Sequence, residues 1–283
     1  MKTIHTLVED INAVIQGKGG WDNTVNEYFM KTMGEAATRR LSSEEEEHTP
    51  SLRMSNIGTP CKRKLWYHLN SKEPVEELPS HTKMSFFFGD MIENLLLSLA
   101  KAAGHTVTGE QDEVTAYGIV GHRDAVIDGV VVDVKSASTK GFDKFKYNQL
   151  RVDDPFGYIQ QLTGYVHASK DDPLVTDKKG GAFLVMDKQF GHICLDYYDL
   201  SPELHLLERH INECKVFSSL PVPPHRGFEP VPEGKSGNMK LPPGCTYCPY
   251  KETCWPDARK FLYSTGPVWL TKVAKLPQVK EIT

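Results

Sequence analysis

The chain of 283 residues carries 33 lysines and arginines against 37 aspartates and glutamates, which gives a formal net charge of -4. Its 39% hydrophobic and 25% charged residues are ordinary for a folded protein with a sizeable core, in one large domain or two small ones. The overall charge excludes a strongly basic nucleic-acid-binding protein. Any contact with DNA must therefore come from local groups of cations, because phosphate neutralisation depends on where the cations lie.

The sequence contains no membrane-spanning or secretory pattern. No apolar run approaches the roughly eighteen residues of a membrane helix, and Glu9 and Asp10 stand where a signal peptide requires apolar residues. We therefore expect a cytoplasmic protein without membrane contact. Its six cysteines are too few for a disulfide scaffold in a chain of this length. Clustered cysteines in a reducing compartment are more often metal ligands.

Residues 1–50 are predicted to form a helical accessory region and a linker. A second helical run is expected from Val25 through Ala37, and the charged run at 43–48 is typical of a solvated linker. The first helix is amphipathic, and its apolar face consists of Leu7, Ile11, Val14 and Ile15.

Residues 51–220 are predicted to form the core, which begins with helices. Ser55 is a candidate N-cap for a short helix that carries CKRKLWYHL. A longer helix with an apolar stripe is expected from about Lys83 to Ala103. Between Val114 and Ser138 the pattern favours short strands, with Asp128-Gly129 as a hairpin turn.

The second half of the core alternates helices and strands. We expect a helix from Phe156 to about Ala168, then strands at 181–188 and 192–199, then one helix starting at Ser201. Such an order predicts an α/β fold in which a mixed central sheet is flanked by helices.

Residues 221–283 are predicted to form a C-terminal loop and a cysteine-bearing segment. The stretch from Pro221 to Gly244 is rich in proline and glycine without periodicity, which favours a loop. It contains a GKS triplet at 234–236, but a phosphate-binding P-loop requires glycine where Glu229 stands. We therefore reject nucleotide hydrolysis by a P-loop.

The segment 121–138 concentrates charged residues in a predicted hairpin. Side chains two apart on a strand share a face, so Asp133 and Lys135 point together, and the hairpin can bring Asp124 beside them. Two carboxylates beside an ammonium are costly to bury unless they bind something, and hard oxygen ligands favour Mg²⁺ or Mn²⁺. A divalent ion there could lower the pKa of a bound water while Lys135 orients that water. The alternative is a hairpin with exposed charges.

Three cysteines near the C-terminal end and one far upstream form a second candidate site. Cys245, Cys248 and Cys254 follow a CxxC pattern with a third cysteine after five more residues, and Cys61 lies in GTPCKRKLWYHL. Four thiolates can hold either a zinc ion or an iron–sulfur cluster, and spacing alone does not separate the two. The remaining cysteines are expected to be buried thiols outside the site: Cys194 and Cys214.

The order of these motifs resembles the PD-(D/E)XK nuclease superfamily. Four motifs in the correct chain order are much harder to obtain by accident than any one of them. The GxxD strand and the D-x-K strand of the family are matched by Gly121, Asp124, Asp133 and Lys135. The RecB-like branch adds a GxxxH/E helix and a QxxxY helix, which are matched by Gly89, Glu93, Gln161 and Tyr165.

The resemblance implies a restriction-endonuclease-like core and a role for each residue. Lys135 would activate the attacking water, and Gly89 would allow its helix to approach the sheet closely. Gln161 and Tyr165, four apart on one helix face, would present a hydrogen-bonding and stacking edge toward DNA. The ligands of Mg²⁺ or Mn²⁺ would be Glu93, Asp124, Asp133 and the backbone carbonyl of Val134.

The cysteine pattern resembles the iron–sulfur exonucleases of the RecB-like class, namely the CRISPR-associated exonuclease of the Cas-four type and the AddB nuclease domain. In these relatives one cysteine before the nuclease core joins three after it. The resemblance covers roughly residues 55–256 and implies a structural 4Fe-4S cluster held by Cys61, Cys245, Cys248 and Cys254, with Zn²⁺ as the alternative. Such relatives also occur in phages.

The expected substrate is DNA, with cleavage from single-stranded ends and a 5′ to 3′ direction favoured by the resemblance. The alternatives are a double-strand-resecting recombination exonuclease acting as a homo-oligomer, and a non-catalytic DNA-binding module. Separately encoded recombination or CRISPR-adaptation proteins are the expected partners. Candidate DNA contacts are the cations Lys62, Arg63, Lys64, Lys140, Lys144, Lys146 and Arg151 and the aromatics Trp66, Tyr67, Phe142, Phe145 and Tyr147.

Overall fold

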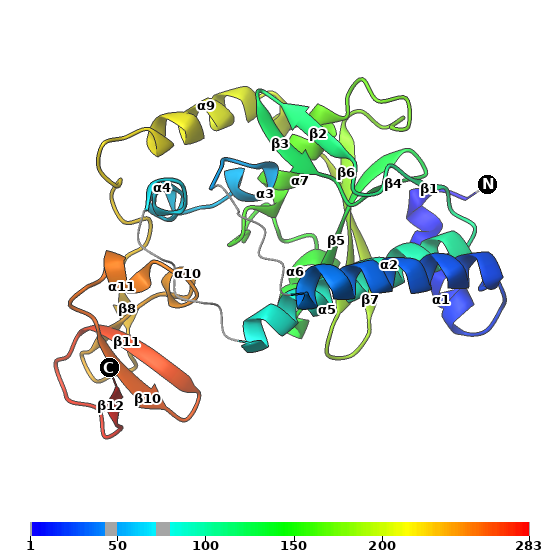
Figure 1. Cartoon of the computed structure of the whole chain (residues 1–283). Helices are drawn as coiled ribbons and strands as arrows, with labels where there is room; N and C mark the ends of the chain where they lie inside the picture. Colours follow the sequence, from blue (N-terminus) through cyan, green and yellow to red (C-terminus); the bar gives the residue numbers. More distant parts are fainter. Residues whose placement is uncertain (1, 43–49, 72–79, 283) are drawn as a thin grey trace. The chain divides into compact units, whose positions relative to one another are not determined.

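The computed structural model describes residues 2–42, 50–71 and 80–282, which form two compact units (Figure 1). The first unit comprises Met1–Gly58 and Leu78–Asn212, and the second comprises Thr59–Glu77 and Glu213–Thr283. This division differs from the predicted boundaries at residues 50 and 220. The N-terminal helices pack within the first unit, and the segment that carries Cys61 packs with the C-terminal residues.

A five-stranded sheet lies at the centre of the first unit, in the order β1-β4-β5-β6-β7. Its strands β5 and β6 run parallel, whereas the other neighbouring pairs are antiparallel. Helices cover both faces, so the predicted mixed α/β class is confirmed at this level. The strands are β1 (Val107–Thr108), β4 (Ala125–Ile127), β5 (Val130–Ala137), β6 (Gly180–Asp187) and β7 (Ile193–Asp199).

The hairpin turn between β4 and β5 lies at the predicted position. Ile127 pairs with Val130, so Asp128 and Gly129 are the two turn residues. Both have positive φ, 50° and 82°, which is the backbone of a type I′ turn and explains why an aspartate and a glycine occupy it. A Cβ on Gly129 would also lie 2.1 Å from the Thr176 hydroxyl oxygen.

Alternate side chains of β5 point to opposite faces of the sheet. Val132 and Val134 belong to one apolar cluster, whereas Val131 belongs to another. Asp133 and Lys135 are two and four residues from Val131, so they point to its face. The predicted separation of the charged residues from Val132 and Val134 is therefore confirmed.

The face of Val132 and Val134 is covered by α1 (Leu7–Ile15) and α5 (Ser80–Ala102), and α2 (Asn23–Leu41) packs on α5 (Figure 1). Leu7 and Ile11 are fully buried, whereas Ile15, at the end of its helix, is 56% exposed and does not share their environment. Within residues 2–42, 50–71 and 80–282, no helix combines the length and apolarity needed to cross a bilayer.

The opposite face is covered by α6 (Thr139–Lys146) and α7 (Tyr158–Ala168). On α7 pack α3 (Met54–Ile57) and the hairpin of β2 (Glu113–Ala116) and β3 (Ile119–His122). The helix predicted from Phe156 starts two residues later, because Gly157 forms its N-cap with φ 77°. A Cβ on Gly157 would lie 1.9 Å from the Gly58 carbonyl oxygen, so the two backbones touch.

The single helix predicted from Ser201 is wrong, since the chain forms α8 (Ser201–Leu204) and then α9 (Leu207–Ser218). Arg151 holds the first turn at the end of β7: its guanidinium lies 2.9 Å from Glu203 Oε1 and donates to the Asp199 carbonyl oxygen at 2.5 Å. Leu207 is fully buried, while Leu206 is 59% exposed between the two helices.

The second unit contains α4 (Lys62–Asn70), and its N-cap corrects another prediction. Cys61, not Ser55, caps this helix, because the Cys61 sulfur accepts a hydrogen bond from the Lys64 amide at 3.4 Å. Ser55 instead lies inside α3 of the first unit. The smallest helices of the second unit are α10 (Pro243–Thr246) and α11 (Lys251–Cys254).

The C-terminal residues form a sheet that the sequence did not predict. Its order is β12-β10-β11-β9-β8, and each neighbouring pair is antiparallel. The predicted loop 221–244 contains two of the strands, and the GKS triplet lies in the turn between them, where the Ser236 hydroxyl donates to Glu233. The strands are β8 (Val231–Pro232), β9 (Met239–Lys240), β10 (Arg259–Tyr263), β11 (Gly266–Lys272) and β12 (Glu281–Ile282).

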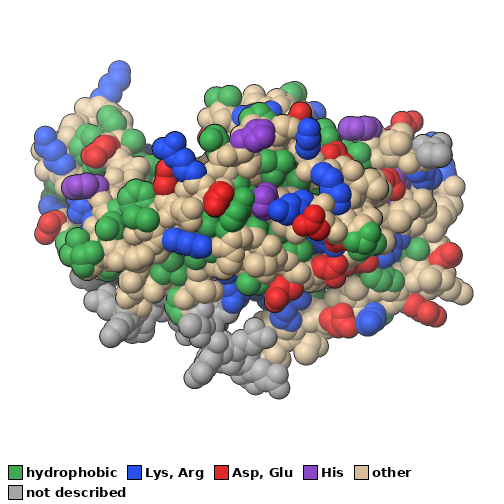
Figure 2. All heavy atoms as spheres, turned by 90° about the horizontal axis from the view of Figure 1, so that it is seen from above, with side chains coloured by type: hydrophobic (Ala, Val, Ile, Leu, Met, Phe, Trp, Pro, Cys, Tyr) green, Lys and Arg blue, Asp and Glu red, His purple; other side chains and the backbone are tan. Residues whose placement is uncertain are grey.

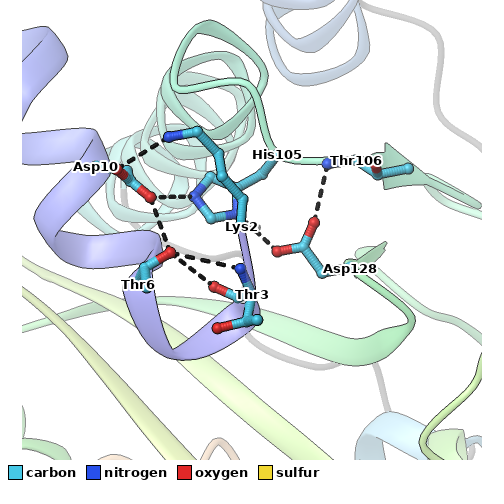
Figure 3. A network of polar contacts seen from close by, with 7 residues as sticks. All are labelled: Lys2, Thr3, Thr6, Asp10, His105, Thr106 and Asp128. Atoms are coloured by element: carbon cyan, nitrogen blue, oxygen red, sulfur yellow. Dashed lines mark hydrogen bonds and ion pairs between the residues drawn. The ribbon is translucent and has the colours of Figure 1, made fainter.

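A buried histidine ties the β4–β5 turn to the N-terminal helix (Figure 3). The His105 side chain is fully buried, with Nδ1 2.6 Å from Asp128 Oδ2 and Nε2 3.1 Å from Asp10 Oδ2. The Thr106 amide donates to the other Asp128 oxygen at 3.0 Å, and the Lys2 ammonium lies 2.9 Å from Asp10. These contacts therefore fix the β4–β5 turn against the N-terminal helix.

Candidate functional site

Three charged residues of the predicted hairpin meet on β5 and beside β4: Asp124, Asp133 and Lys135. Together with Glu93 on α5, we call them the acidic site. The Lys135 ammonium lies 2.5 Å from Asp133 Oδ2. Asp124 directly precedes β4, and its Oδ2 accepts a hydrogen bond of 2.7 Å from the Val134 amide. The hairpin thus brings both carboxylates and the ammonium together, as the sequence predicted.

Within the acidic site, the buried Asp133 carboxylate is costly to ionise without a further partner. Asp133 is 1% exposed, and its Oδ1 has no hydrogen-bond partner among the described residues, whereas Oδ2 lies against the Lys135 ammonium. The Lys135 ammonium compensates the Asp133 charge at Oδ2 but leaves Oδ1 without a partner. An ionised carboxylate in such a place is costly unless a cation or further donors complete its surroundings.

The third carboxylate, Glu93 on α5, is half-buried and accepts a hydrogen bond of 2.6 Å from Gln111 Nε2. Burial and the negative charges of Asp90 and Asp133 together raise the pKa of Glu93 to about 7, against the lowering effect of the Gln111 hydrogen bond. Burial also raises the pKa of Asp133 and, together with the charges of Asp133 and Glu93, that of Asp124. The carboxylates therefore lie close enough to repel one another and would all gain from a bound cation.

Lys135 is held in its charged form by its neighbours. Burial lowers the pKa of its ammonium, but the Asp133 and Asp124 carboxylates more than offset this, so the net shift is upward. Its nitrogen lies 4.9 Å from the centroid of the Tyr158 ring on α7, within the range of a cation–π contact. Lys135 therefore lies between a carboxylate and an aromatic ring.

The two residues of the predicted QxxxY helix lie together on α7, but not as a DNA-facing edge. Gln161 Nε2 lies 3.3 Å from the Tyr165 hydroxyl oxygen. Tyr165 is 4% exposed within the apolar core, so its ring has no open face on which a base could stack. Burial and the Asp133 charge raise the pKa of its hydroxyl, which stays neutral near the acidic site. Tyr165 is thus a core residue that borders this site.

The motif glycines differ in what surrounds them. A Cβ on Gly121 would lie 2.6 Å from two Met54 side-chain carbons and 2.8 Å from Tyr165 Cε1, so the GxxD glycine is required by packing. A Cβ on Gly89 would meet only the Ser136 hydroxyl oxygen, at 3.9 Å. The expected close approach of α5 at Gly89 is therefore wrong.

Two cavities of the first unit open beside the acidic site. One, of about 340 Å³, is lined by Glu93 and by residues of α2 and α5. At its edge, Asp90 accepts hydrogen bonds from Arg40 and Arg39, which lower its pKa although burial raises it. The other, of about 250 Å³, is lined by Lys135 and Tyr158. Molecules of modest size can therefore reach the acidic site.

Among the described residues, no group of three or more histidine, cysteine, aspartate or glutamate side chains is placed so that it could hold a metal ion as it stands. In the acidic site, Lys135 lies against Asp133, and Gln111 engages Glu93. Val134 contributes its amide, not its carbonyl, to the Asp124 contact. The unpartnered Asp133 Oδ1 and the oxygen-only donor set nevertheless fit a hard divalent cation.

All four cysteines predicted as ligands line one small pocket of the second unit. The pocket also contains Tyr67, Tyr250 and Trp255, and its free volume is about 20 Å³. Cys248 is buried, while the other three cysteines are partly buried. We call Cys61, Cys245, Cys248 and Cys254 the cysteine site.

The thiols of the cysteine site are close enough to influence one another. Burial raises the pKa of Cys245 to about 11, and the neighbouring thiols add to the shift. Burial likewise raises the pKa of Cys248, so thiolates would need a cationic centre. A Cβ on Gly227 would lie 3.0 Å from the Cys61 sulfur, so the backbone closes directly over this residue. An enclosed set of sulfur donors fits a thiophilic metal centre.

Most of the predicted DNA-binding residues have structural partners instead. Phe142, Phe145 and Tyr67 are buried, so their rings cannot stack on bases. The ion pairs of Lys144 with Asp153 and of Arg151 with Glu203 occupy those cations. On the face seen in Figure 2, lysine and arginine side chains are interspersed with acidic ones and do not form one continuous patch.

The remaining members of the predicted set divide between the two units. In the first unit, Tyr147 is 60% exposed, and Lys140 and Lys146 lie on the surface. In the second unit, polar partners are found for Lys62 at the Cys214 sulfur, Arg63 at the Pro224 carbonyl and Trp66 at the Leu220 carbonyl. Cys214 is fully buried, as predicted, and Cys194 is partly buried.

Sequence reasoning missed several residues that shape the acidic site. Gln111 and Tyr158 come from a loop and from the start of α7, and no local pattern links them to Glu93 or Lys135. Asp90 could have been found, because it lies three residues before Glu93 and therefore on the same face of α5.

Comparisons with known proteins give little further guidance. No family model and no curated protein matches the chain. The crystal structure of SSO0001 is similar over 80% of this chain and 95% of its own, with a TM-score of 0.42 and 17% sequence identity. A likeness at this level identifies neither a fold family nor an activity.

Proposed function

We propose that the protein is a metal-dependent deoxyribonuclease with a PD-(D/E)XK core, in which the acidic site is the active site. The observation that carries this proposal is the Asp133 carboxylate, which is 1% exposed, has the Lys135 ammonium against Oδ2, and has no hydrogen-bond partner for Oδ1 among the described residues. The charges of Asp133 and Glu93 add to the burial that raises the pKa of Asp124, and the Asp133 charge also raises the pKa of Glu93, so the three carboxylates are costly to ionise without a cation.

The donor set supports Mg²⁺ or Mn²⁺, held by Glu93, Asp124 and Asp133. Such an ion, when bound, supplies a Lewis acid that polarises a phosphodiester and acidifies water. The Val134 amide holds the Asp124 carboxylate in place. The Lys135 ammonium stays protonated beside Tyr158 and can hold a water or a phosphate oxygen.

The residues around the acidic site support it by packing. Tyr165 and Met54 press against Gly121, three residues before Asp124, and this fixes the strand that leads into the site. Gln161 lies beside the Tyr165 hydroxyl. In the proposed enzyme, these residues position the acidic site and do not contact bases.

DNA as the substrate, with attack on single-stranded ends and 5′ to 3′ polarity, follows from the resemblance of the four motifs. A double-strand-resecting exonuclease is the alternative within the same chemistry. A cytoplasmic location and separately encoded recombination or CRISPR-adaptation partners belong to the same proposal.

For the cysteine site we propose a structural iron–sulfur cluster, with zinc as the alternative. Four sulfurs around one zinc ion stand about 3.8 Å apart, given Zn–S bonds of about 2.3 Å in a tetrahedron. The described cysteines line one pocket, and the chain supplies one CxxC pair, one single cysteine and one remote cysteine, whereas zinc ribbons usually supply two CxxC pairs. A cluster places several atoms between its thiolates and tolerates a wider ring. Iron, sulfide and zinc analysis of protein purified without oxygen decides between them.

The experiment that tests the nuclease is cleavage of end-labelled single- and double-stranded DNA with Mg²⁺ or Mn²⁺. Wild type should cleave in a metal-dependent manner, and Asp133→Ala should not. Asp143→Ala is the matched control, because Asp143 is an exposed carboxylate on α6. A folded wild type that cleaves neither DNA with either metal, or an Asp133→Ala variant as active as wild type, contradicts the proposal.

A further inference from the structure

The cavity of about 250 Å³ beside Lys135 has a chemistry of its own. It lies past the C-terminal end of the charged stretch of β5, and its lining includes three lysines and no carboxylate. Apolar and aromatic side chains, Phe156 and Tyr158 among them, form the rest of the wall together with Ser136 and Ser138. A pocket that joins cations to aromatic faces fits an anion attached to a ring system.

The three lysines of this cavity are not equivalent. Lys135 lies 2.5 Å from Asp133, and Lys144 lies 2.7 Å from Asp153, so a carboxylate outside the cavity compensates each of them. Lys188 is exposed, and its ammonium takes part in no ion pair or hydrogen bond with residues of the described ranges. Its backbone amide donates to the Ala137 carbonyl at 2.9 Å, which fixes its position at the cavity. Lys188 is therefore the cation that remains for a ligand.

The aromatic wall is open on one side. Phe156 is 65% exposed although it packs against Tyr158, with ring centroids 5.3 Å apart. Tyr158 also lies under the Lys135 ammonium, at 4.9 Å, which connects this wall to the acidic site. An exposed phenyl ring beside a free ammonium can stack on a base only when that base is unpaired.

We propose that this cavity is the subsite for the nucleotide next to the cleaved bond, with its phosphate at Lys188 and its base on Phe156. The inference rests on the proposed function and deepens it. At about 250 Å³ the cavity lies just below the roughly 300–1,000 Å³ of usual ligand pockets, which suits one nucleotide unit and leaves no room for a base pair. The subsite thereby selects single-stranded DNA.

The test measures binding of the mononucleotide dTMP to the whole protein by calorimetry, without added divalent cation. We expect dTMP to bind at least about tenfold more tightly than thymidine and than inorganic phosphate, since charged contact and stacking both contribute. Lys188→Glu should weaken dTMP binding by about tenfold or more. Phe156→Ala should weaken dTMP and leave inorganic phosphate unchanged.

The matched control is Lys170→Glu, which makes the same charge change at an exposed lysine outside the cavity. Equal losses in Lys188→Glu and Lys170→Glu, or equal affinities for dTMP, thymidine and phosphate, overturn the inference. Because no cleavage is needed, the two proposals fail separately. A protein that binds dTMP as expected but cleaves no DNA keeps the subsite and loses the nuclease, and a nuclease without this binding loses the subsite alone.

Discussion

The acidic site and the cysteine site both gather residues that are far apart in the sequence, yet their surroundings differ. The acidic site borders cavities of about 340 and 250 Å³, whereas the cysteine site encloses only about 20 Å³ between aromatic rings. In both, burial raises the pKa of the ligand-type groups, so a bound cation would stabilise their ionised forms. In the proposed enzyme, this difference in access would let substrate and product exchange at the acidic site, while the cysteine site would enclose a permanent structural centre.

The largest expected effect is on cleavage by Lys135→Ala. Removing a group that acts in the chemical step should lower the rate by roughly 10²–10⁴-fold, while the metal content of the cysteine site stays unchanged. Rates on end-labelled DNA and metal analysis of the same sample measure the two. Lys146→Ala, at an exposed lysine on α6, is the control. A Lys135→Ala protein that retains cleavage would mean that the acidic site is not catalytic.

Cys248→Ala should instead lower the stability of the second unit. Structural metal centres in small domains contribute roughly 10–16 kcal/mol of binding free energy to folding, so the second unit should lose its metal and melt at a lower temperature. Metal analysis and thermal unfolding followed by circular dichroism measure this. Cys194→Ala should keep the metal, because Cys194 lies on β7 outside the pocket. If both variants behave alike, the cysteine site binds nothing.

The two motif glycines should respond differently to alanine. Gly121→Ala places a Cβ 2.6 Å from Met54 carbons in a packed core, and such overpacking costs about 1–3 kcal/mol. Gly89→Ala meets nothing closer than 3.9 Å in a helix and should stabilise the protein by roughly 0.5–1 kcal/mol. Chemical denaturation gives both values. If Gly89→Ala destabilises the protein, then α5 lies closer to the sheet than the 3.9 Å between a Gly89 Cβ and the Ser136 hydroxyl oxygen indicates.

The smallest expected effect is on stability against pH in metal-free protein. Glu93 has an ordinary pKa of 4.5, and burial raises it to about 7 in the fold, so ionisation works against folding. The contribution of Glu93 is fully present below pH 4.5 and is lost as the pH rises to about 7. Glu93→Gln should flatten this part of the profile, and added Mg²⁺ should reverse the loss. An unchanged profile in Glu93→Gln would contradict the assigned pKa.

The local elements of the fold were largely predictable from sequence. Alternation placed Asp133 and Lys135 opposite Val132 and Val134, and the Asp128-Gly129 pair specified its turn, because strand geometry and positive φ act over a few residues. The same reasoning failed at Tyr165, since helix spacing gives a shared face but not whether that face is buried. It also failed for the C-terminal strands: β8, β9 and β12 have two residues each, and β11, although seven residues long, does not alternate regularly between buried and exposed positions.

The sequence by itself determined which residues could do chemistry: three carboxylates, a lysine and four cysteines, each in a recognisable spacing. Only the tertiary structure decided that Asp133 Oδ1 has no partner among the described residues, that Lys135 lies on Tyr158, and that Lys188 remains free at a cavity. The physical reason is that burial and charge coupling depend on distances between segments such as α5, β5 and α7. Chain spacing fixes those distances only within one helix or hairpin.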